Sequence, residues 1–453
     1  MGEKLIVIGG TAAGLSAASK ARRLNPELDI KVFEKSGYVS YGACGLPYFV
    51  GGLIDEPEDL IAISANDLTI KRNISTFTHH EVTKIDREKK SVSVMNLNTK
   101  ETRNFMYDKL VIATGAVPIK PSIPGVHSVG VYYLRTVEDG IMLKERALTS
   151  GQIAAIIGGG FIGLEMAEEL MRRGISVHLY EMMDRLLPFL DVNFSNIVKE
   201  NLERNGIKVH LNTKVDEFQT ENGHVKAVMT SKGEKQDVDF VLLSIGVKPA
   251  TDLAKAAELE LGIKDAIVVD DGMQTNDLSI WACGDCVQMK HLVTGRPTYV
   301  PLGTTANKQG KVAGENLAGG KEIFPGVLGS MVTKVFDLTI AATGLSAEQA
   351  NQAGLNPAIS IITKADKASY YPGGKDNKIC LILDKSTGRL LGAQGIGSES
   401  VAGRINVFAA AITCGMTVTQ ISELDLVYAP PVAPVYDPVL IAASQAIKMV
   451  ERQ

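Results

Sequence analysis

A single cysteine lies among small residues in the stretch Ser40–Tyr48, which reads SYGACGLPY. Glycines on either side of Cys44 let a substrate or a cofactor ring come close to its thiol. A thiol reacts as the thiolate, so we expect a helix N-terminus or a nearby cation to lower the pKa of Cys44. The alternative is a buried, inert cysteine. The neighbouring residues favour a redox-active thiol.

The residues before Cys44 have the pattern of a dinucleotide-binding unit. The β-branched run Lys4–Ile8 predicts a strand, and an Ala/Ser-rich helix is expected to end near Leu24. Small residues between them let backbone N–H groups at the helix N-terminus bind a pyrophosphate. A second strand, Ile30–Glu34, ends at an acid whose spacing suits a ribose-hydroxyl acceptor. The residues of the turn are Gly9, Gly10, Thr11, Ala12, Ala13 and Gly14.

A second copy of this pattern lies further along the chain. The predicted strand Gln152–Ile157 runs into a complete G-x-G-x-x-G, and the predicted helix Leu164–Arg173 and strand Ser176–Glu181 follow. Glu181 would accept hydrogen bonds from a 2′-hydroxyl and repel a 2′-phosphate, which favours NADH over NADPH, although Arg185 could offset this preference. The turn residues are Gly158, Gly160, Phe161, Ile162 and Gly163.

Two such units imply two dinucleotides, and we assign a flavin to the first and a nicotinamide to the second. Residues 110–115 and 241–246 each predict a strand that ends at a glycine, one closing each unit. Three prolines at 118, 121 and 124 mark the crossover out of the first domain. Gly284 and Asp285 are positioned after a strand to hold a flavin ribityl hydroxyl. A helix beginning at Pro301 would direct its dipole to the flavin ring.

Composition bounds the class of protein. The chain has 453 residues, 45% of them hydrophobic, and a net charge of −4, so we expect two to four domains and no nucleic-acid partner. No apolar run spans a bilayer and no signal peptide is evident, which predicts a cytoplasmic protein without a membrane partner. Five cysteines do not form a secreted disulfide framework. The C-x-x-C pair Cys283 and Cys286 lacks the second ligand pair of a zinc site, so no metal is predicted.

The character of the sequence changes near Phe324. Strands at 359–363, 379–383 and 390–396 are expected to alternate with amphipathic helices, which predicts an α/β domain used for assembly. Two tyrosine-containing turns lie there, 370–373 (YYPG) and 428–431 (YAPP). We predict an α/β fold with a flavin domain at 1–148 and 271–323, a nicotinamide domain at 149–270 and a third domain at 324–453.

Together these motifs resemble the flavoprotein pyridine-nucleotide disulfide oxidoreductases over essentially the whole chain. The Cys44 stretch and the two tyrosine turns are similar to the single-cysteine branch, which contains coenzyme A-disulfide reductase and NADH-dependent persulfide and polysulfide reductases. The resemblance implies two Rossmann-like domains, a C-terminal dimerisation domain, FAD, NADH with NADPH as an alternative, and a homodimer. It also implies reduction of coenzyme A disulfide, coenzyme A persulfide or polysulfide.

The resemblance assigns roles to individual residues. Cys44 would form a mixed disulfide with coenzyme A, and Tyr428 of the partner subunit would act on the leaving thiolate with either Tyr370 or Tyr371. The residues implied to meet coenzyme A are Ser16, Lys20, Arg23, Ser40 and Arg72. Besides the first turn and Glu34, those implied for FAD are Lys35, Val82, Ala113, Thr114, Gly115, Arg135, Gly284, Asp285, Pro301, Thr304 and Thr305. Besides the second turn and Glu181, Gly246 is implied for NAD(P)H.

The chain also departs from related patterns. It lacks the second redox cysteine and the C-terminal histidine of the two-cysteine reductases, which argues against glutathione, lipoamide and mercury substrates. Ala12 occupies the position at which NADH oxidases and peroxidases carry a histidine. Longer relatives append a rhodanese-like domain that does not follow here, so we expect any persulfide to come from a separate molecule. The alternatives are an NADH oxidase or peroxidase with a Cys44 sulfenic acid, and a flavin-bearing redox sensor.

Overall fold

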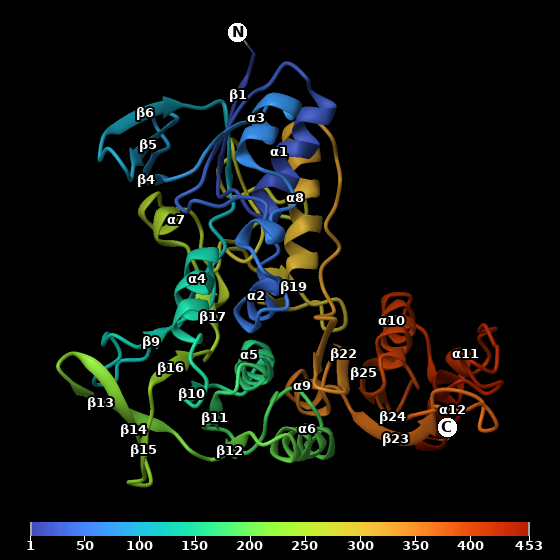
Figure 1. The fold of residues 1–453 in the computed structure, drawn as a ribbon. Helices are drawn as coiled ribbons and strands as arrows, with labels where there is room; N and C mark the ends of the chain where they lie inside the picture. Colours follow the sequence, from blue (N-terminus) through green and yellow to red (C-terminus); the bar gives the residue numbers. More distant parts are fainter. Residues whose placement is uncertain (1, 452–453) are drawn as a thin grey trace.

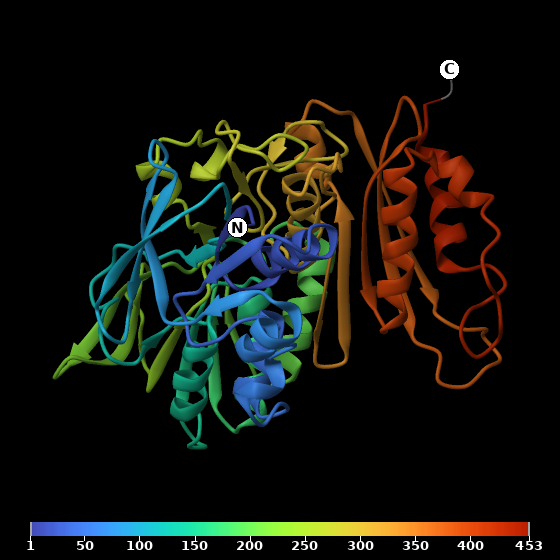
Figure 2. The ribbon, with the colours of Figure 1, turned by 90° about the horizontal axis from the view of Figure 1, so that it is seen from above.

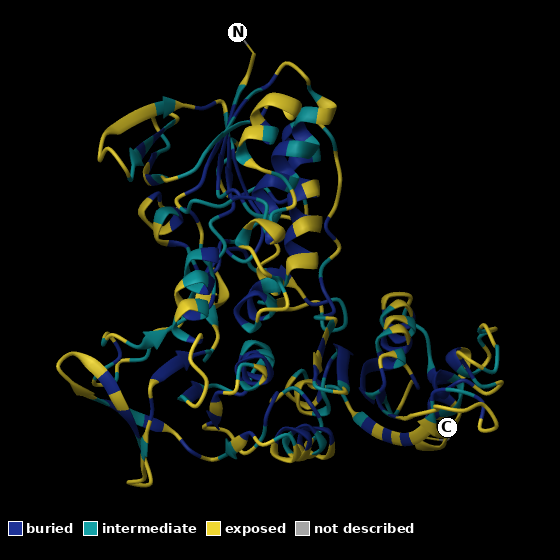
Figure 3. Cartoon of the chain, viewed as in Figure 1, coloured by how far each residue is buried: buried dark blue, intermediate teal, exposed yellow. Residues whose placement is uncertain are grey.

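The structure is a computed structural model that describes residues 2–451. Two five-stranded parallel sheets and one five-stranded antiparallel sheet form its three main units (Figures 1 and 2). The strands are largely buried, whereas the outer faces of the helices are exposed (Figure 3). The predicted α/β fold class is confirmed.

The first unit is built on a parallel sheet in the order β18-β7-β1-β2-β3. Successive side chains of β1 point to opposite faces of the sheet. Leu5 and Val7 therefore join the core under the helices, and Ile6 and Ile8 join the core under a small antiparallel sheet. β18 reaches this sheet from beyond the second unit, so the first unit is discontinuous. The strands are β1 (Lys4–Ile8), β2 (Asp29–Phe33), β3 (Ser75–Phe77), β7 (Lys109–Ile112), β18 (Ile280–Ala282), and in the small sheet β4 (His80–Asp86), β5 (Ser91–Asn96) and β6 (Thr102–Met106).

Helices α1 (Ala12–Leu24) and α8 (Gly303–Leu317) lie side by side on this sheet (Figure 1). The helices approach so closely that a Cβ atom added at Gly310 would lie 2.2 Å from the carbonyl oxygen of Ala13. One added at Gly314 would lie 2.4 Å from the carbonyl oxygen of Ala17. Small residues therefore set the distance between the helix that follows the first glycine turn and the helix that follows Pro301.

The second unit is a parallel sheet in the order β12-β11-β10-β16-β9. The edge strand β9 comes from residues before the expected boundary at 148, because Val131 pairs with Val241. The strands are β9 (Val131–Tyr132), β10 (Ile153–Ile157), β11 (Ser176–Tyr180), β12 (Lys208–His210) and β16 (Phe240–Leu243), with an antiparallel sheet of β13 (Val215–Glu221), β14 (His224–Thr230) and β15 (Lys235–Asp237). The helices are α4 (Val137–Arg146), α5 (Phe161–Arg172) and α6 (Val192–Arg204), whereas α7 (Asp252–Ala256) packs against β4 of the first unit.

The third unit is an antiparallel sheet in the order β21-β22-β25-β24-β23. The predicted alternation of strands and helices is wrong, because most strands follow one another through short connections, as antiparallel pairing allows, and three helices come last. The predicted strands themselves are present. The elements are β21 (Met331–Val335), β22 (Leu338–Gly344), α9 (Ala347–Gln352), β23 (Pro357–Ala365), β24 (Asp376–Asp384), β25 (Leu390–Gly397), α10 (Ser400–Thr413), α11 (Val418–Ser422) and α12 (Pro438–Ala446).

Short elements complete the chain. Antiparallel strands β8 (Ala116–Pro118) and β17 (Val247–Pro249) connect the first two units. The others are α2 (Leu46–Gly51), α3 (Ala65–Arg72), β19 (Met289–Lys290), β20 (Pro297–Thr298) and the 3-10 turns η1 (Ala43–Gly45), η2 (Pro57–Leu60), η3 (Ile263–Asp265) and η4 (Ile447–Met449). Across residues 2–451, every helix is too short or too polar to cross a membrane.

A buried histidine in the second sheet predicts acid sensitivity. The ring of His178 stacks on that of His210 at 5.4 Å, and burial, followed by Lys208 and His210, lowers the pKa of His178 to about 4. In the unfolded chain the same ring binds a proton near pH 6.5, so below that pH protonation favours the unfolded state. The contribution of the neutral ring to the free energy of unfolding, about 3 kcal/mol, is complete above pH 6.5 and is lost as the pH falls toward 4. We expect His178→Phe to reduce the fall in melting temperature between pH 7.5 and 5. The exposed His127, replaced by Gln, serves as control, and an equal fall in both variants would contradict the prediction.

Candidate functional site

Cys44 lies in η1, directly before α2. The backbone of this segment is tied to the segment 60–62, because the amide of Gly42 donates to the carbonyl of Leu60 at 2.9 Å. All five cysteines are free and lie in the described part of the chain; Cys44 and Cys414 are exposed, and the other three are buried. The alternative of a buried Cys44 is therefore wrong, whereas its redox activity stays a prediction.

The electrostatic surroundings of Cys44 differ from the prediction. Desolvation and the carboxylate of Glu165 raise the pKa of the Cys44 thiol, whereas Arg135 lowers it by less. The expected lowering of this pKa by groups of the chain is therefore wrong. The lowering effect of Arg135 on this pKa is smaller than the raising effect of partial burial and of two acids from other segments, Glu165 and Asp285.

The first glycine turn forms a cradle without side chains. Gly9 has φ +106°, and a Cβ atom there would lie 2.2 Å from the carbonyl oxygen of Ala113. A Cβ atom at Gly14 would lie 2.0 Å from the carbonyl oxygen of Gly9. The buried carboxylate of Glu34 accepts from the amides of Gly10 at 2.8 Å and Ser36 at 2.9 Å. The glycines thus let the turn pack against neighbouring carbonyls, with an acid fixed beside the N-terminus of α1, where a pyrophosphate is expected to bind.

The second glycine turn repeats this geometry. Gly158 has φ +111°, and a Cβ atom at Gly163 would lie 2.1 Å from the carbonyl oxygen of Gly158. The buried carboxylate of Glu181 accepts from the amides of Gly159 and Met183, each at 2.8 Å. Helix α5 begins at Phe161, three residues earlier than predicted, because the helix starts inside the glycine motif.

The other predicted flavin residues come from six separate segments of the chain. Arg135 forms an ion pair with Asp285 at 2.8 Å, and Thr114 donates its hydroxyl proton to the carbonyl of Ala250 at 2.6 Å. Gly284 has φ +89° and donates its amide proton to Gln309 at 2.9 Å. Of the remaining predicted flavin residues, Lys35 and Thr304 are exposed, Val82, Ala113 and Thr305 are buried, Gly115 has positive φ, and Pro301 precedes α8. Gly246, predicted for NAD(P)H, also has positive φ.

Three glutamates on one face of α5 were not predicted as site residues. Glu165 accepts from the hydroxyl of Thr333 at 2.7 Å, and Glu168 accepts from the amide of Phe336 at 2.6 Å. Burial raises the pKa of Glu169 to about 7, and its Oε2 has no hydrogen-bond partner among the described residues. Their spacing of three and four residues, which places all three on one helix face, was the available sequence signal. This face packs between α2 and β21.

The residues expected to meet coenzyme A are only partly free. On α1, Ser16 donates to Asn307 at 2.8 Å, and Lys20 pairs with Glu315 at 2.5 Å. Arg23 and Arg72 are exposed. Ser40 has φ +53°, with its amide bonded to the carbonyl of Gly10 and its own carbonyl to the amide of Ala62. The predicted group of three cations is thus reduced to two that are available to a phosphate.

The tyrosines divide into a pair and a single residue. The hydroxyl groups of Tyr370 and Tyr428 are 3.0 Å apart, and this hydrogen bond, followed by desolvation, raises the pKa of Tyr428. Tyr371 instead has the ammonium of Lys367 over its ring at 5.8 Å. We call Tyr370 and Tyr428 the tyrosine pair. Both ribbon views place the loops that carry this pair at the outer end of the third unit, well apart from η1 and α2 (Figures 1 and 2).

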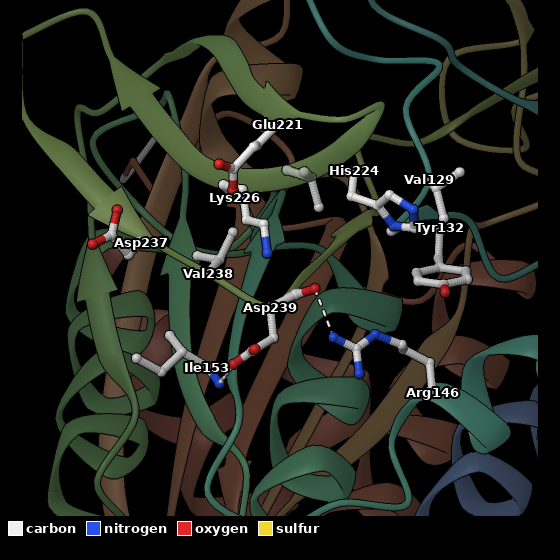
Figure 4. A pocket seen from close by; sticks show the side chains of 12 residues that line it. Val129, Tyr132, Arg146, Ile153, Glu221, His224, Lys226, Asp237, Val238 and Asp239 are labelled. Carbon is white, nitrogen blue, oxygen red and sulfur yellow. Dashed lines mark hydrogen bonds between the residues drawn. The ribbon is translucent and has the colours of Figure 1, made fainter.

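A surface cleft of about 700 Å³ lies elsewhere, on the second unit (Figure 4). Arg146 crosses it and donates to the carbonyl of Asp239 at 2.8 Å. Lys226 and His224 line it together with Glu221, so its charge is mixed. None of the predicted site residues lines this cleft.

The two cradles and the exposed thiol define an oxidoreductase that carries electrons between two dinucleotides and a sulfur centre. Residues 3–310 match the family described as pyridine nucleotide-disulphide oxidoreductase, and residues 331–438 match the dimerisation domain of that family. The chain belongs to this family.

Three comparisons cover nearly the whole chain. It is 38% identical to an NADH oxidase of Methanocaldococcus jannaschii, over 98% of this chain and 99% of that protein. It is 36% identical to the NAD(P)H coenzyme A polysulfide/persulfide reductase of Pyrococcus horikoshii, over 98% of each. The solved structure of an NAD-dependent persulfide reductase from A. fulgidus has a TM-score of 0.95 and 41% identity, covering 98% of this chain and 83% of that one. The predicted family is confirmed.

Proposed function

We propose that this protein is an FAD-dependent NAD(P)H oxidoreductase that reduces coenzyme A disulfide, coenzyme A persulfide or polysulfide through Cys44. The observation that carries the proposal is the exposed thiol of Cys44 at the start of α2, between two dinucleotide cradles. The sulfur substrate follows from relatives such as the coenzyme A polysulfide/persulfide reductase.

The residues of the first cradle fit FAD. Gly9 and Gly14 let the turn pack closely against neighbouring backbone carbonyls, Glu34 provides a fixed acceptor for ribose hydroxyls, and Asp285, oriented by Arg135, suits a ribityl hydroxyl. When bound, FAD would supply a two-electron carrier from NAD(P)H to the mixed disulfide of Cys44, whose reduction returns the Cys44 thiol and releases the second thiol product.

The chain supplies the sulfur chemistry. The Cys44 thiolate attacks one sulfur of the substrate, a mixed disulfide forms, and the second sulfur leaves as a thiolate that takes a proton. We assign that proton to the tyrosine pair of the partner subunit in a homodimer, because the loops that carry the pair lie far from α2, the helix that follows η1 in their own chain. Exposed apolar residues on β23, such as Ile359 and Ile361, and the matched dimerisation domain support the homodimer. Exposed Arg23 and Arg72 would bind the phosphates of coenzyme A.

Steady-state NADH oxidation tests the proposal. We expect coenzyme A disulfide or polysulfide to accelerate it far more than oxygen or hydrogen peroxide does. The intact mass of the non-reduced protein, compared with that of a sample treated with reductant, gives a second readout. A reductant-sensitive increase in mass on Cys44 that equals the mass of coenzyme A supports the proposal. Faster turnover with oxygen or peroxide, or a gain of one or two oxygen atoms, would contradict it.

An NADH oxidase is the second candidate, favoured by the similarity to the M. jannaschii protein. Against it, Ala12 is the first residue of α1 and has no acid–base group to offer to a peroxide. The same assays decide between the two candidates.

Nucleotide choice is predicted to depend on Glu181. Its carboxylate is held by two backbone amides, and Arg185, the cation that could offset its charge, is already paired with Asp184 at 2.9 Å. We expect Glu181→Gln to raise the ratio of kcat/KM for NADPH to that for NADH by about tenfold or more, because the negative charge facing a 2′-phosphate is removed. Glu34→Gln is the matched control, and we expect it to weaken FAD retention without changing this ratio. An unchanged ratio in Glu181→Gln would contradict the assignment.

A further inference from the structure

The segment that carries Tyr428 is anchored at its far end by a buried arginine. Arg404 of α10 and Asp437 are each 7% exposed. The guanidinium Nε donates to Oδ1 of Asp437 at 3.1 Å, and Nη2 donates to Oδ2 at 2.9 Å. Asp437 also caps α12 by accepting from the amide of Val439 at 2.8 Å. The carboxylate of Asp437, at the end of the Tyr428 segment, is therefore fixed both by two N–H donors of the Arg404 guanidinium and by the N-terminus of α12.

The same guanidinium reaches the loop that carries Tyr370. Nη2 of Arg404 donates to the carbonyl of Asp366, the first residue after β23, at 3.1 Å. The 5%-exposed carboxylate of Asp366 closes that loop, because it accepts from the amide of Lys375 at 2.8 Å and from the hydroxyl of Ser398 at 2.7 Å. One planar group thus joins the bases of two loops. We call Arg404, Asp437 and Asp366 the Arg404 network.

The loops meet again at their tips. The amide of Ala368 donates to the carbonyl of Pro430 at 3.4 Å, and the hydroxyls of Tyr370 and Tyr428 are 3.0 Å apart. Tyr370 is 73% exposed, so its position depends on its loop more than on packing of its ring. Fixing the loop bases therefore fixes the distance between the two hydroxyls.

We propose that the Arg404 network positions the tyrosine pair for protonation of the leaving sulfur. This inference rests on the proposed function. A buried ion pair is weak evidence for net stability, since an apolar replacement is often as stable, whereas the rigid fork of arginine fixes the relative orientation of its partners. Displacing a proton donor by about 1 Å lowers a rate by about a hundredfold. A network that keeps the two tyrosine hydroxyls in place would therefore maintain the rate of sulfur protonation.

The test uses the full-length, FAD-loaded protein and two electron acceptors. Coenzyme A disulfide requires the thiol and the proton donor, whereas ferricyanide accepts electrons without either. We expect Arg404→Gln to lower kcat for coenzyme A disulfide by about ten- to hundredfold, while the KM for NADH and the ferricyanide rate stay unchanged. Asp437→Asn should give the same pattern, and Arg404→Lys, which keeps the charge but not the fork, should be intermediate. If Arg404→Gln does not fold, the other two variants carry the test.

The exposed pair Lys334 and Glu399 on the same unit provides the matched control, and Lys334→Gln should keep both activities.

A double variant separates positioning from general damage. Added to Tyr428→Phe, Arg404→Gln should cause no further loss; a multiplied loss, an equal loss with ferricyanide, or no loss in the single variant would overturn the inference. If Tyr428→Phe alone keeps full activity, the proposed role of the tyrosines and the inference both fail.

Discussion

Replacing Cys44 with serine is expected to lower NADH-dependent reduction of coenzyme A disulfide or polysulfide by at least about a thousandfold. A serine hydroxyl can neither form a disulfide nor attack sulfur as a thiolate at neutral pH. Because Cys44 is exposed and not part of a packed core, the variant should fold and bind FAD normally.

The control for this prediction is Cys414→Ser. Cys414 is the other exposed cysteine, and its replacement removes a thiol of similar exposure at the C-terminal end of α10. We expect Cys414→Ser to keep full activity and both variants to keep the ferricyanide rate. Disulfide reduction that survives in Cys44→Ser with FAD bound would remove the central residue of the proposal.

The reactivity of Cys44 should also respond to Glu165. Desolvation and then this carboxylate raise the pKa of the Cys44 thiol, whereas Arg135 lowers it by less, so removing the Glu165 charge should increase the thiolate fraction. This dependence could not be predicted from the sequence, since Glu165 comes from a helix of the second unit and reaches Cys44 only through the packing of α2 on α5.

The parts of the site that were predictable are local in the chain. Each cradle consists of a strand, a glycine turn and a helix, followed by a strand that ends in an acid, so the spacing from Gly14 to Glu34 or from Gly163 to Glu181 fixes the geometry. The hydrogen bonds of both acids to their own glycine turns show why the spacing is so informative.

The parts that were not predictable depend on tertiary contacts. Strand β9 has two residues, too few for any periodicity, and becomes a strand only by pairing with β16. The Arg404 network joins residues from three separate segments. The helical spacing of Val401 and Phe408 places Arg404 on the buried face of α10, but its partners Asp437 and Asp366 are distant in the sequence. Similarly, only the structure distinguishes Tyr370 from its neighbour Tyr371.

Replacing Tyr428 with phenylalanine is expected to lower disulfide reduction by about a hundredfold, because a general acid contributes about this much. Tyr370→Phe should act mainly through pH. The hydrogen bond from Tyr370 raises the pKa of Tyr428 above its usual value near 10. A tyrosine is an acid only below its pKa, so loss of this bond should move the alkaline limit of kcat to lower pH. Tyr371→Phe, which removes the hydroxyl outside the pair, should leave the rate and the profile unchanged.

Subunit mixing tests where the tyrosine comes from. A heterodimer of one Cys44→Ser subunit and one Tyr428→Phe subunit, purified through two different tags, contains two inactive chains. If Tyr428 serves the partner's thiol, one of the two sites combines an intact Cys44 with an intact Tyr428, and the heterodimer should recover about half of the wild-type rate. If each chain used its own tyrosine, both sites would lack one group and the rate would stay at the level of the single variants. Recovery would therefore establish both the dimer and the exchange of the tyrosine pair across its interface.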